Sequence, residues 1–487
     1  MSTSTSTESQ NAQDIPTLAS DENTENISDV VTDSKESEFN RAAIDKLGNR
    51  IRITDTDEEN NLELMCYVRC GPEDSGLIRQ CRGVVFHDTD IVMRAFPYTV
   101  EFSTREENLI RDNIETVFGE CSFYDAYEGA LIRMFNFNGK WYISTHRKLN
   151  AFRSKWSSKE SFGTCFKRAL EAEIQNNEKL RNSLPSNDNS ILERFQSTLD
   201  PDKQYMFLVS HNEENRIVCA VPSRPTLYHV GTFVNGVLEM TENINIPYPR
   251  KHTFLDIESL LYYVKTIDIR NLQGVIIFAP DNRQFKVLHN DYIDFFRARG
   301  NEPSIKYRYL QVRMNSKLVD MLYHLYPDMC DTFDEYENII YAIAKNIHSS
   351  YIQRHIKNKW STLPTEEYAV DRACHSWHEA DRKNNRVSID KVIEVLNEQS
   401  ATNLNKMIRR FREEKLKQKE SQTMVQTRNR SNTVTSTTYS PVINEADISP
   451  LLLSKNRKRN NTTSPNLGPT APCVVSETHV LSEYENK

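Results

Sequence analysis

One short segment combines basic and aromatic side chains, the two types that contact single-stranded nucleic acid. Residues 141–156 read Trp-Tyr-Ile-Ser-Thr-His-Arg-Lys-Leu-Asn-Ala-Phe-Arg-Ser-Lys-Trp, and the basic members are Arg147, Lys148, Arg153 and Lys155. Basic groups neutralise phosphates, and aromatic faces stack on bases. A hairpin strand with its aromatics towards the core and its charges towards water would give the same pattern. The segment predicts RNA or single-stranded nucleic acid as a partner, with the plain hairpin as an equal alternative.

Two further basic clusters lie towards the end of the chain. Residues 406–419 hold seven bases in a helix-like run, among them Arg409, Arg410 and Arg412, and Lys455-Asn456-Arg457-Lys458-Arg459 follows. Binding of nucleic acid by that many bases would release counterions. The second cluster is also typical of a nuclear-localisation signal. A solvated helix face and a solvated tail are the alternative interpretations.

Four short segments occur in an order that is typical of one kind of chemistry. They are Cys81-Arg82-Gly83-Val84-Val85-Phe86, Tyr127-Glu128-Gly129-Ala130-Leu131-Ile132-Arg133, Asn215-Arg216-Ile217-Val218, and Gln273-Gly274-Val275-Ile276-Ile277 followed by Phe285-Lys286-Val287. Over about residues 80–290 the arrangement resembles the phage-type RNA ligases of the covalent nucleotidyltransferase superfamily. The resemblance implies a nucleotidyltransferase-like body followed by a helical C-terminal domain.

The groups that perform the chemistry of that family are missing. The resemblance implies a lysine that attacks the α-phosphorus of ATP and carboxylates that hold a divalent metal. Ala126 occupies the lysine position, and a methyl group cannot attack phosphorus. The carboxylate positions hold Phe207 or Leu208 and Gln273, and Leu288 replaces the second lysine of the last motif. We therefore predict no adenylyl transfer, no metal site and no established cofactor, because function follows the site and not the fold.

Several family residues survive and are candidates for binding a nucleotide or phosphate: Arg82, Glu128, Gly129, Arg216 and Lys286. The same residues would be present if they only closed a sheet. An active RNA ligase or capping-type nucleotidyltransferase is the alternative, with Lys140 or Lys148 as a displaced nucleophile and with ATP and magnesium as cofactors. A scaffold that binds proteins through its tails is the third hypothesis, and its protein partners are unknown.

A second resemblance concerns the whole body between the tails. Residues 127–133 through 146–149, together with Arg299-Gly300-Asn301-Glu302-Pro303-Ser304-Ile305, resemble the immediate-early infected-cell proteins of iridoviruses. This resemblance implies a viral protein that is expressed early and is located inside the infected host cell. The cluster at residues 455–459 adds the expectation of import into the nucleus.

The composition excludes several other classes of protein. The 487 residues include only 13 glycines, no GxGxxG occurs, and no Gly pair at P-loop spacing is followed by Lys-Ser/Thr. A P-loop NTPase and a dinucleotide-binding unit are therefore not expected. No run of 18 apolar residues occurs, which predicts no membrane span. The nine cysteines have no framework spacing, so we expect free thiols in a reducing compartment and no zinc site at Cys66 and Cys70.

The pattern along the chain predicts an α+β fold with two disordered tails. Residues 1–37 carry eight acids and one base and are expected to be disordered, as are residues 421–487, which are rich in Ser, Thr and Asn. Residues 38–300 show short β-type runs and predict an antiparallel-sheet body. Residues 301–420 show helical periodicity and predict an α-helical domain.

Local signals predict some elements in detail. Asn138-Gly139 and Asn235-Gly236 each predict a two-residue β-hairpin, and residues 91–102 predict one strand. Ser388 is expected to cap a helix over residues 389–396, and Thr332 with Glu335 to form a capping box. Residues 297–309, with four bases and two tyrosines, are interpreted as a solvated linker between the two domains.

Overall fold

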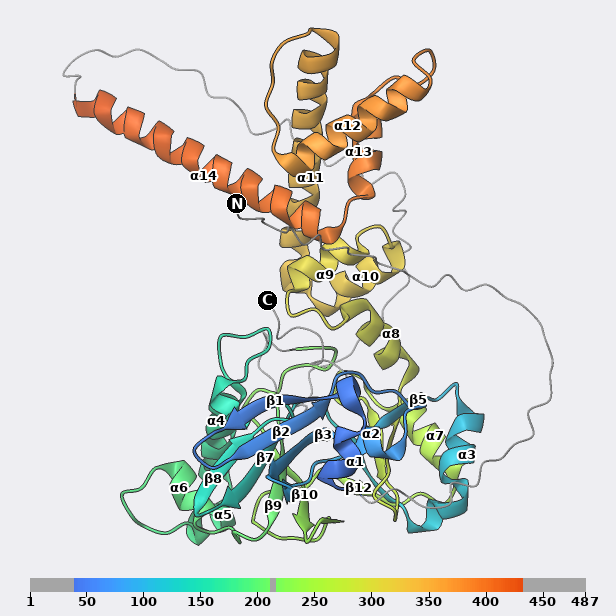
Figure 1. Cartoon of the computed structure of the whole chain (residues 1–487), viewed down its shortest axis with the longest axis vertical. Coiled ribbons are helices and arrows are strands. Elements are labelled where there is room, and N and C mark those ends of the chain that lie inside the picture. The colour runs from blue at the N-terminus through green and yellow to red at the C-terminus, as the bar shows by residue number, and fades with distance from the viewer. Residues whose placement is uncertain (1–38, 211–215, 432–487) are drawn as a thin grey trace, which may run out of the picture. The chain divides into compact units, whose positions relative to one another are not determined.

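The computed structural model describes residues 39–210 and 216–431. The acidic N-terminal tail, most of the C-terminal tail and the basic cluster at residues 455–459 lie outside the described residues. Strands and inserted helices alternate up to residue 288, and only helices follow from residue 290 (Figure 1). The prediction of an antiparallel-sheet body followed by an α-helical region is confirmed.

The described strands form three sheets. The first sheet contains, in spatial order, β1 (Ile51–Asp57), β2 (Leu62–Tyr67), β3 (Arg82–His87) and β4 (Asp90–Met93). The second contains β11 (Val237–Glu239), β10 (Leu227–Val234), β9 (Gln204–Val209), β7 (Ala130–Phe137) and β8 (Lys140–Ser144). The third contains β12 (Lys251–His252), β6 (Ser122–Ala126), β13 (Gly274–Phe278), β14 (Gln284–Leu288) and β5 (Val100–Ser103).

One strand pair differs from the antiparallel expectation. β5 pairs with β14 in parallel. The single strand expected over residues 91–102 is wrong, because β4 ends at Met93 and β5 begins at Val100. Pro97 lies in this gap, and proline cannot donate to a strand ladder. The break allows β5 to join the third sheet instead of the first.

Both predicted hairpins are confirmed. β7 and β8 meet at Asn138-Gly139, with φ of 51° and 78°, and β10 and β11 meet at Asn235-Gly236, with φ of 51° and 79°. Positive φ at both central residues defines the turn type that matches the twist of the flanking strands. Local turn chemistry therefore sets the register of both hairpins.

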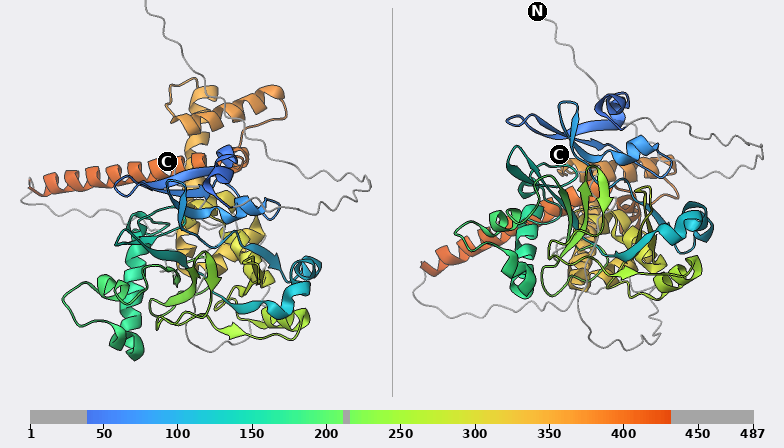
Figure 2. Two further views of the ribbon diagram at one scale, coloured as in Figure 1. Left: turned by 60° about the horizontal axis from the view of Figure 1, so that its bottom comes forward. Right: turned by 90° about the horizontal axis from the view of Figure 1, so that it is seen from below.

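Inserted helices cover the sheets of the body, as Figure 2 shows from two further sides. Their bounds are α1 (Arg41–Asp45), α2 (Gly76–Gln80), α3 (Glu107–Ile114), α4 (Phe162–Asn176), α5 (Glu178–Ser183), α6 (Ile191–Gln196) and α7 (Ile257–Thr266). Helix α4 packs on β7, β9 and β10, whereas α3 packs beside β5 and α7 beside β14.

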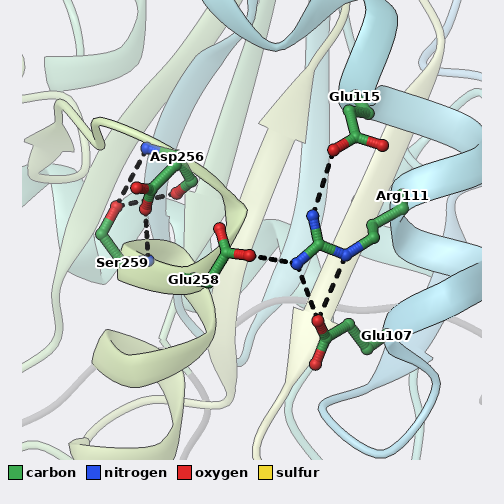
Figure 3. A network of polar contacts seen from close by, with 6 residues as sticks. All are labelled: Glu107, Arg111, Glu115, Asp256, Glu258 and Ser259. Carbon is green, nitrogen blue, oxygen red and sulfur yellow. Dashed lines mark hydrogen bonds and ion pairs between the residues drawn. The ribbon is translucent and has the colours of Figure 1, made fainter.

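Helices α3 and α7 are joined by the guanidinium of Arg111 (Figure 3). The Arg111 guanidinium donates to Glu107 of α3 at 2.8 Å and to Glu115, which directly follows α3, at 3.1 Å. It also forms an ion pair with Glu258 of α7. Asp256 and Ser259 form a capping box at the start of α7. Because these charges are largely exposed, they orient the helices, and burial of the apolar helix faces supplies most of the stability.

The C-terminal region consists of helices. Their bounds are α8 (Asn290–Arg299), α9 (Ile305–Val312), α10 (Ser316–Leu325), α11 (Cys330–Tyr351), α12 (Thr365–Ala380), α13 (Ile389–Asn397) and α14 (Ala401–Ser431). Helix α11 packs against α12, α13 and α14. No helix in the described ranges is both long and apolar enough to cross a membrane.

Two expectations about helix starts have different outcomes. Ser388 caps α13, because its side chain accepts from the backbone N–H of Lys391. The capping box at Thr332 is wrong, since α11 already begins at Cys330 and its N-cap is Met329. A 3₁₀ turn, Pro327–Met329, leads directly into α11. The chain therefore enters the helix one turn earlier, with no side-chain cap.

The solvated linker expected over residues 297–309 is wrong. These residues complete α8 and begin α9, and Arg299 is fully buried. Its guanidinium donates to the carbonyl oxygens of Gly300 and Glu302 and lies over the ring of Trp156. Backbone carbonyls thus satisfy a charge that looked solvated in the sequence.

A buried histidine in the second sheet makes stability depend on pH. His229 of β10 has its Nε2 at 3.0 Å from the carbonyl oxygen of Gly231 and 2.8 Å from Thr232 Oγ1. Burial lowers the pKa of His229 to about 4. The unfolded imidazole takes up a proton first as the pH falls, so the stabilisation is present above about pH 6.5 and is lost towards pH 4. We expect this group to lower the free energy of unfolding by about 2 kcal/mol between about pH 7 and pH 5.

Urea denaturation at the two pH values measures this loss. His229→Gln removes the titrating group. The difference between the variant's unfolding free energies at pH 7 and pH 5 should therefore be about 2 kcal/mol smaller than that of the wild type, even if the substitution lowers the stability at both pH values. Equal pH dependence in the variant and the wild type would contradict the assignment.

Candidate functional site

A cavity is lined by strands of all three sheets. Its walls are mainly apolar and are formed by Phe96, Tyr124, Leu131, Leu208, Val230, Met240, Pro249, Ile276 and Phe278. A small number of charged groups, Arg82, Asp125 and Lys286, line it as well. This mixture of apolar walls and few charges is typical of a small-molecule site.

Two of the positions at which the ligase-like motifs depart from their pattern lie in this cavity. Ala126 at the end of β6 and Leu208 of β9 both line it, together with Arg82 and Lys286. Phe207, the other candidate for the carboxylate position, points to the opposite side and packs against Phe166 of α4. The side chains that Ala126 and Leu208 contribute to the cavity wall are a methyl and an isobutyl group, neither of which can react with a phosphate or bind a metal.

Lys286 is the lysine that lines the cavity within the described part of the chain. Its side chain is 1% exposed, and Nζ donates to Glu101 Oε1 at 3.3 Å and to Gln273 Oε1 at 3.2 Å. Burial lowers the pKa of this ammonium group, and the carboxylate of Glu101 opposes the shift. Strands β14 and β5 position the pair, because Lys286 and Glu101 are direct neighbours in their register.

A second cavity adjoins the partners of Lys286. Glu101 and Gln273 line it, together with Leu288, Tyr292 and Arg297. Lys286 lines the first cavity while its two hydrogen-bond partners line the second. Two further departures from the motif pattern, Gln273 and Leu288, therefore lie on this side.

Buried cations cluster behind Arg82. Arg133 is fully buried, and its guanidinium donates to the carbonyl oxygens of Gly83 and Thr145. Arg147 is also buried, and its Nε has no hydrogen-bond partner. No carboxylate of the described residues pairs with Arg133 or Arg147. Burial of a charge without a counter-charge is costly, so the cluster favours an anion.

The same cluster acts on nearby ionisable groups. Burial lowers the pKa of Arg133 to about 9. The pKa of His146 lies well below its ordinary value, first because of burial and then because of Arg82, Arg147 and Arg133. His146 is therefore neutral at pH 7, and the positive potential comes from the arginines.

The analysis of motifs missed Asp125, which precedes Ala126 and also lines the cavity. Its Oδ1 accepts from Tyr263 Oη at 2.8 Å and lies 2.7 Å from His252 Nε2, and Tyr127 Oη donates to Oδ2 at 3.3 Å. His252 and Tyr263 are 127 and 138 residues away in the sequence. No local pattern could have revealed this set, and its carboxylate is already occupied by protein donors.

Three of the nucleotide-binding candidates lie outside the first cavity. The buried carboxylate of Glu128 accepts from the backbone N–H of Val218 at 3.0 Å and of Cys219 at 3.2 Å, and burial raises its pKa. Gly129 is buried next to it. Arg216 donates to the carbonyl oxygen of Cys219, and its own carbonyl accepts from Tyr326 Oη at 3.0 Å. These residues connect the sheet body to the helical region.

The basic and aromatic segment divides between core and surface. Tyr142 and Trp156 are buried, as the hairpin interpretation requires, and Arg147 is buried with them. Lys148 lies 4.0 Å from Asp55 Oδ1. The exposed basic side chains are Arg153 and Lys155, next to the partly exposed Phe152. Nucleic-acid binding by this segment stays a prediction, restricted to those exposed residues.

The three arginines of α14 that were predicted to bind nucleic acid, Arg409, Arg410 and Arg412, are engaged within the chain. Arg410 forms ion pairs with Glu366 at 2.5 Å and Glu367 at 3.5 Å of α12. Arg412 pairs with Glu335 of α11 at 2.5 Å, and the exposed Arg409 lies 3.5 Å from Glu413. These contacts hold α14 against α11 and α12, and binding of nucleic acid by these arginines stays a prediction.

Neither proposed substitute nucleophile lines the cavity. Lys140 Nζ lies 3.0 Å from Asp57 Oδ2, and Lys148 lies beside Asp55. The cysteines of the described ranges are free thiols, and burial raises the pKa of Cys70 to about 12. Over these same ranges, no three His, Cys, Asp or Glu side chains come together as metal ligands.

Comparison with known proteins identifies viral relatives. The chain is 27% identical over 395 residues to an immediate-early protein ICP-46 homolog of Invertebrate iridescent virus 6, covering 75% of this chain and 84% of that protein. This finding confirms the resemblance to the iridovirus immediate-early proteins. The chain is also 21% identical over 276 residues to a protein of Autographa californica nuclear polyhedrosis virus named "Putative bifunctional polynucleotide kinase/RNA ligase", covering 54% of this chain and 37% of that protein.

Among solved structures, an archaeal ATP-dependent RNA ligase aligns with a TM-score of 0.32 at 12% identity, over 55% of this chain and 65% of that chain. No protein-family model matches the sequence.

Proposed function

We propose that this relative of the iridovirus immediate-early proteins acts early in infection inside the host cell, where it binds a nucleotide, or a phosphate-bearing end of a nucleic acid, without transferring it. The observation that carries the proposal is the composition of the cavity. It keeps Arg82 and Lys286 but has Ala126 and Leu208 at the positions of the reacting amine and the carboxylate. The names of the iridovirus and baculovirus relatives support the early timing and the ligase-like ancestry.

The walls of the cavity suit the two halves of a nucleotide. Apolar side chains such as Phe96 and Phe278 offer surfaces for a base, and Lys286 with Arg82 offers charge for a phosphate. An ammonium group in a buried site interacts with phosphate more strongly than it would in water. Bond formation to phosphorus does not follow, because Ala126 has no nucleophilic atom.

The buried arginines make the proposed binding independent of a metal. In the related enzymes' chemistry a divalent metal offsets the charge of the phosphates, held by carboxylates. Arg133 and Arg147 contribute positive charge behind Arg82 and have no carboxylate partner in the described residues. We therefore expect nucleotides to bind in the presence of EDTA.

Two measurements on the purified full-length protein test the proposal. With α-labelled ATP or GTP and magnesium, the denatured protein should carry no label. In EDTA, AMP or ATP at about 100 times its Kd should raise the free energy of unfolding by about 3 kcal/mol, seen as a higher thermal midpoint. Label that disappears in Lys140→Ala or Lys148→Ala would establish the active-enzyme alternative instead.

The scaffold hypothesis predicts a different pair of results. It expects no change of the thermal midpoint with any nucleotide. It also expects RNA affinity that is absent or insensitive to salt, because counterion release accompanies phosphate contacts. Either a nucleotide-dependent midpoint or a salt-dependent RNA affinity would contradict it.

A further inference from the structure

The loop that joins α11 to α12 (Figure 1) contains a tryptophan whose side chain is exposed to solvent. Trp360 is 91% exposed, and Ile356 in the same loop is 66% exposed. Lys357 and Lys359, on either side of Asn358, are exposed as well. Large aromatic side chains are normally buried, so an almost fully exposed tryptophan indicates a contact surface.

Contacts with α12 fix the start of this loop. It begins with a π-helical turn, Ile352–Ile356, a feature often found at functional sites. His355 Nε2 lies 3.1 Å from Asp371 Oδ2 of α12, and the guanidinium of Arg354 stacks 4.5 Å from the ring centre of Tyr368. Both side chains therefore tie the start of the loop to α12.

Backbone and side-chain hydrogen bonds close the loop. The N–H of Lys359 donates to the carbonyl oxygen of Gln353 at 2.8 Å, and Ser350 Oγ lies 2.9 Å from Ser361 Oγ. Holding Trp360 in water on a braced loop gives no stability to the fold. The arrangement instead lowers the entropy lost when a partner binds.

The charge around the tryptophan indicates the kind of partner. Residues 338–365 contain four Lys or Arg residues and no Asp or Glu. Neither Lys357 nor Lys359 forms an ion pair with any carboxylate that the structure describes.

We infer that the loop of residues 356–360, here called the Trp360 loop, binds single-stranded nucleic acid. Trp360 stacks on an unpaired base, and Lys357 and Lys359 contact the adjacent phosphates. A base inside a duplex offers no free face, so the partner is single-stranded. A membrane surface is a weaker match, because two exposed apolar side chains bury little area in an interface. The inference extends the proposed nucleic-acid binding to a surface that does not include the cavity.

Binding of a labelled oligouridylate of about 16 nucleotides to the full-length protein tests this inference. In EDTA and low salt, fluorescence anisotropy should show that Trp360→Ala weakens binding about tenfold, the size expected for loss of one stacked base. Trp360→Phe should keep most of the affinity. Lys357→Glu with Lys359→Glu should weaken binding and reduce the slope of log Kd against log salt by about 1.4, for two phosphate contacts.

Matched variants elsewhere on the surface serve as controls. Tyr262→Ala removes an aromatic side chain that is 72% exposed on α7, and Lys179→Glu with Lys265→Glu makes the same change of net charge. Neither control should change the affinity for the oligonucleotide more than about twofold, because surface substitutions away from a site have effects of this size. Equal losses in the control and loop variants would overturn the inference, as would unchanged binding by Trp360→Ala.

The outcome is separable from that of the proposed function. Trp360→Ala should keep the rise of the thermal midpoint with nucleotide. If this rise is present and oligonucleotide binding is unaffected by Trp360→Ala, only the inference about the loop fails. If the rise is absent in the wild type but binding still depends on Trp360, only the cavity proposal fails. If Trp360→Ala loses binding to anionic vesicles but keeps its oligonucleotide binding, the partner of the loop is a membrane surface and not a nucleic acid.

Discussion

Replacing Lys286 by methionine is expected to weaken nucleotide binding about 30-fold, or about 2 kcal/mol, the lower range for truncating one partner of a buried charged contact. Methionine has nearly the same length but cannot donate a hydrogen bond or balance phosphate charge. Since Lys286 is the lysine that lines the cavity, no other ammonium group of the described residues takes over its role. Calorimetric titration with AMP or ATP in EDTA measures the loss.

The substitution should leave the fold intact. Lys286 forms an ion pair with Glu101, whose carboxylate is 23% exposed and can be hydrated when the ammonium is removed. Lys286→Arg should restore part of the affinity, because it restores a donor and a charge. Unfolding curves of both variants establish that binding is compared between folded proteins.

Lys140→Met provides the matched control. It makes the same chemical change at a lysine that pairs with Asp57 and does not line the cavity. Its nucleotide affinity should equal that of the wild type. Wild-type affinity in Lys286→Met, or an equal loss in Lys140→Met, would contradict the binding mode proposed here.

Local sequence signals predicted the elements whose geometry is set by neighbouring residues. The two Asn-Gly hairpins and the Ser388 cap depend on the backbone preferences of two to four consecutive residues. The change from β-type runs to helical periodicity likewise predicted the α+β order. Of the five residues predicted to bind a nucleotide or phosphate, Arg82 and Lys286 line one cavity together with Ala126, and the other three lie outside it. Nucleotide binding by these residues stays a prediction.

Features that depend on distant residues could not be predicted in this way. The occupation of Asp125 by His252 and Tyr263 requires strands and helices more than 120 residues apart to meet. Arg299 looked like part of a solvated linker, because its charge is satisfied by backbone carbonyls that no residue pattern shows. The Trp360 loop was missed for a related reason, since exposure of a tryptophan is decided by the tertiary packing of α11 and α12.

Gly274→Ala is expected to lower the free energy of unfolding by about 3 kcal/mol or more, the upper range for inserting one carbon atom into a packed site. Gly274 of β13 pairs with Leu288 of β14 and with Ala126 of β6. A Cβ atom on Gly274 would lie 1.9 Å from the carbonyl oxygen of Val287 and 2.9 Å from Leu288 Cα. Both obstacles are backbone atoms, so β13 and β14 must separate. Urea denaturation measures the loss.

Gly119→Ala is the control, because a Cβ atom there meets nothing within 4 Å. Its unfolding free energy should stay within about 0.5 kcal/mol of the wild type. The same separation of strands would move Gln273 away from Lys286, so Gly274→Ala should also weaken nucleotide binding. Gly274 is thus required by the spacing of two strands, and its presence in a ligase-like motif needs no catalysis to explain it. If Gly274→Ala were as stable as the wild type, this steric explanation would be lost and the surviving motif would again point to chemistry.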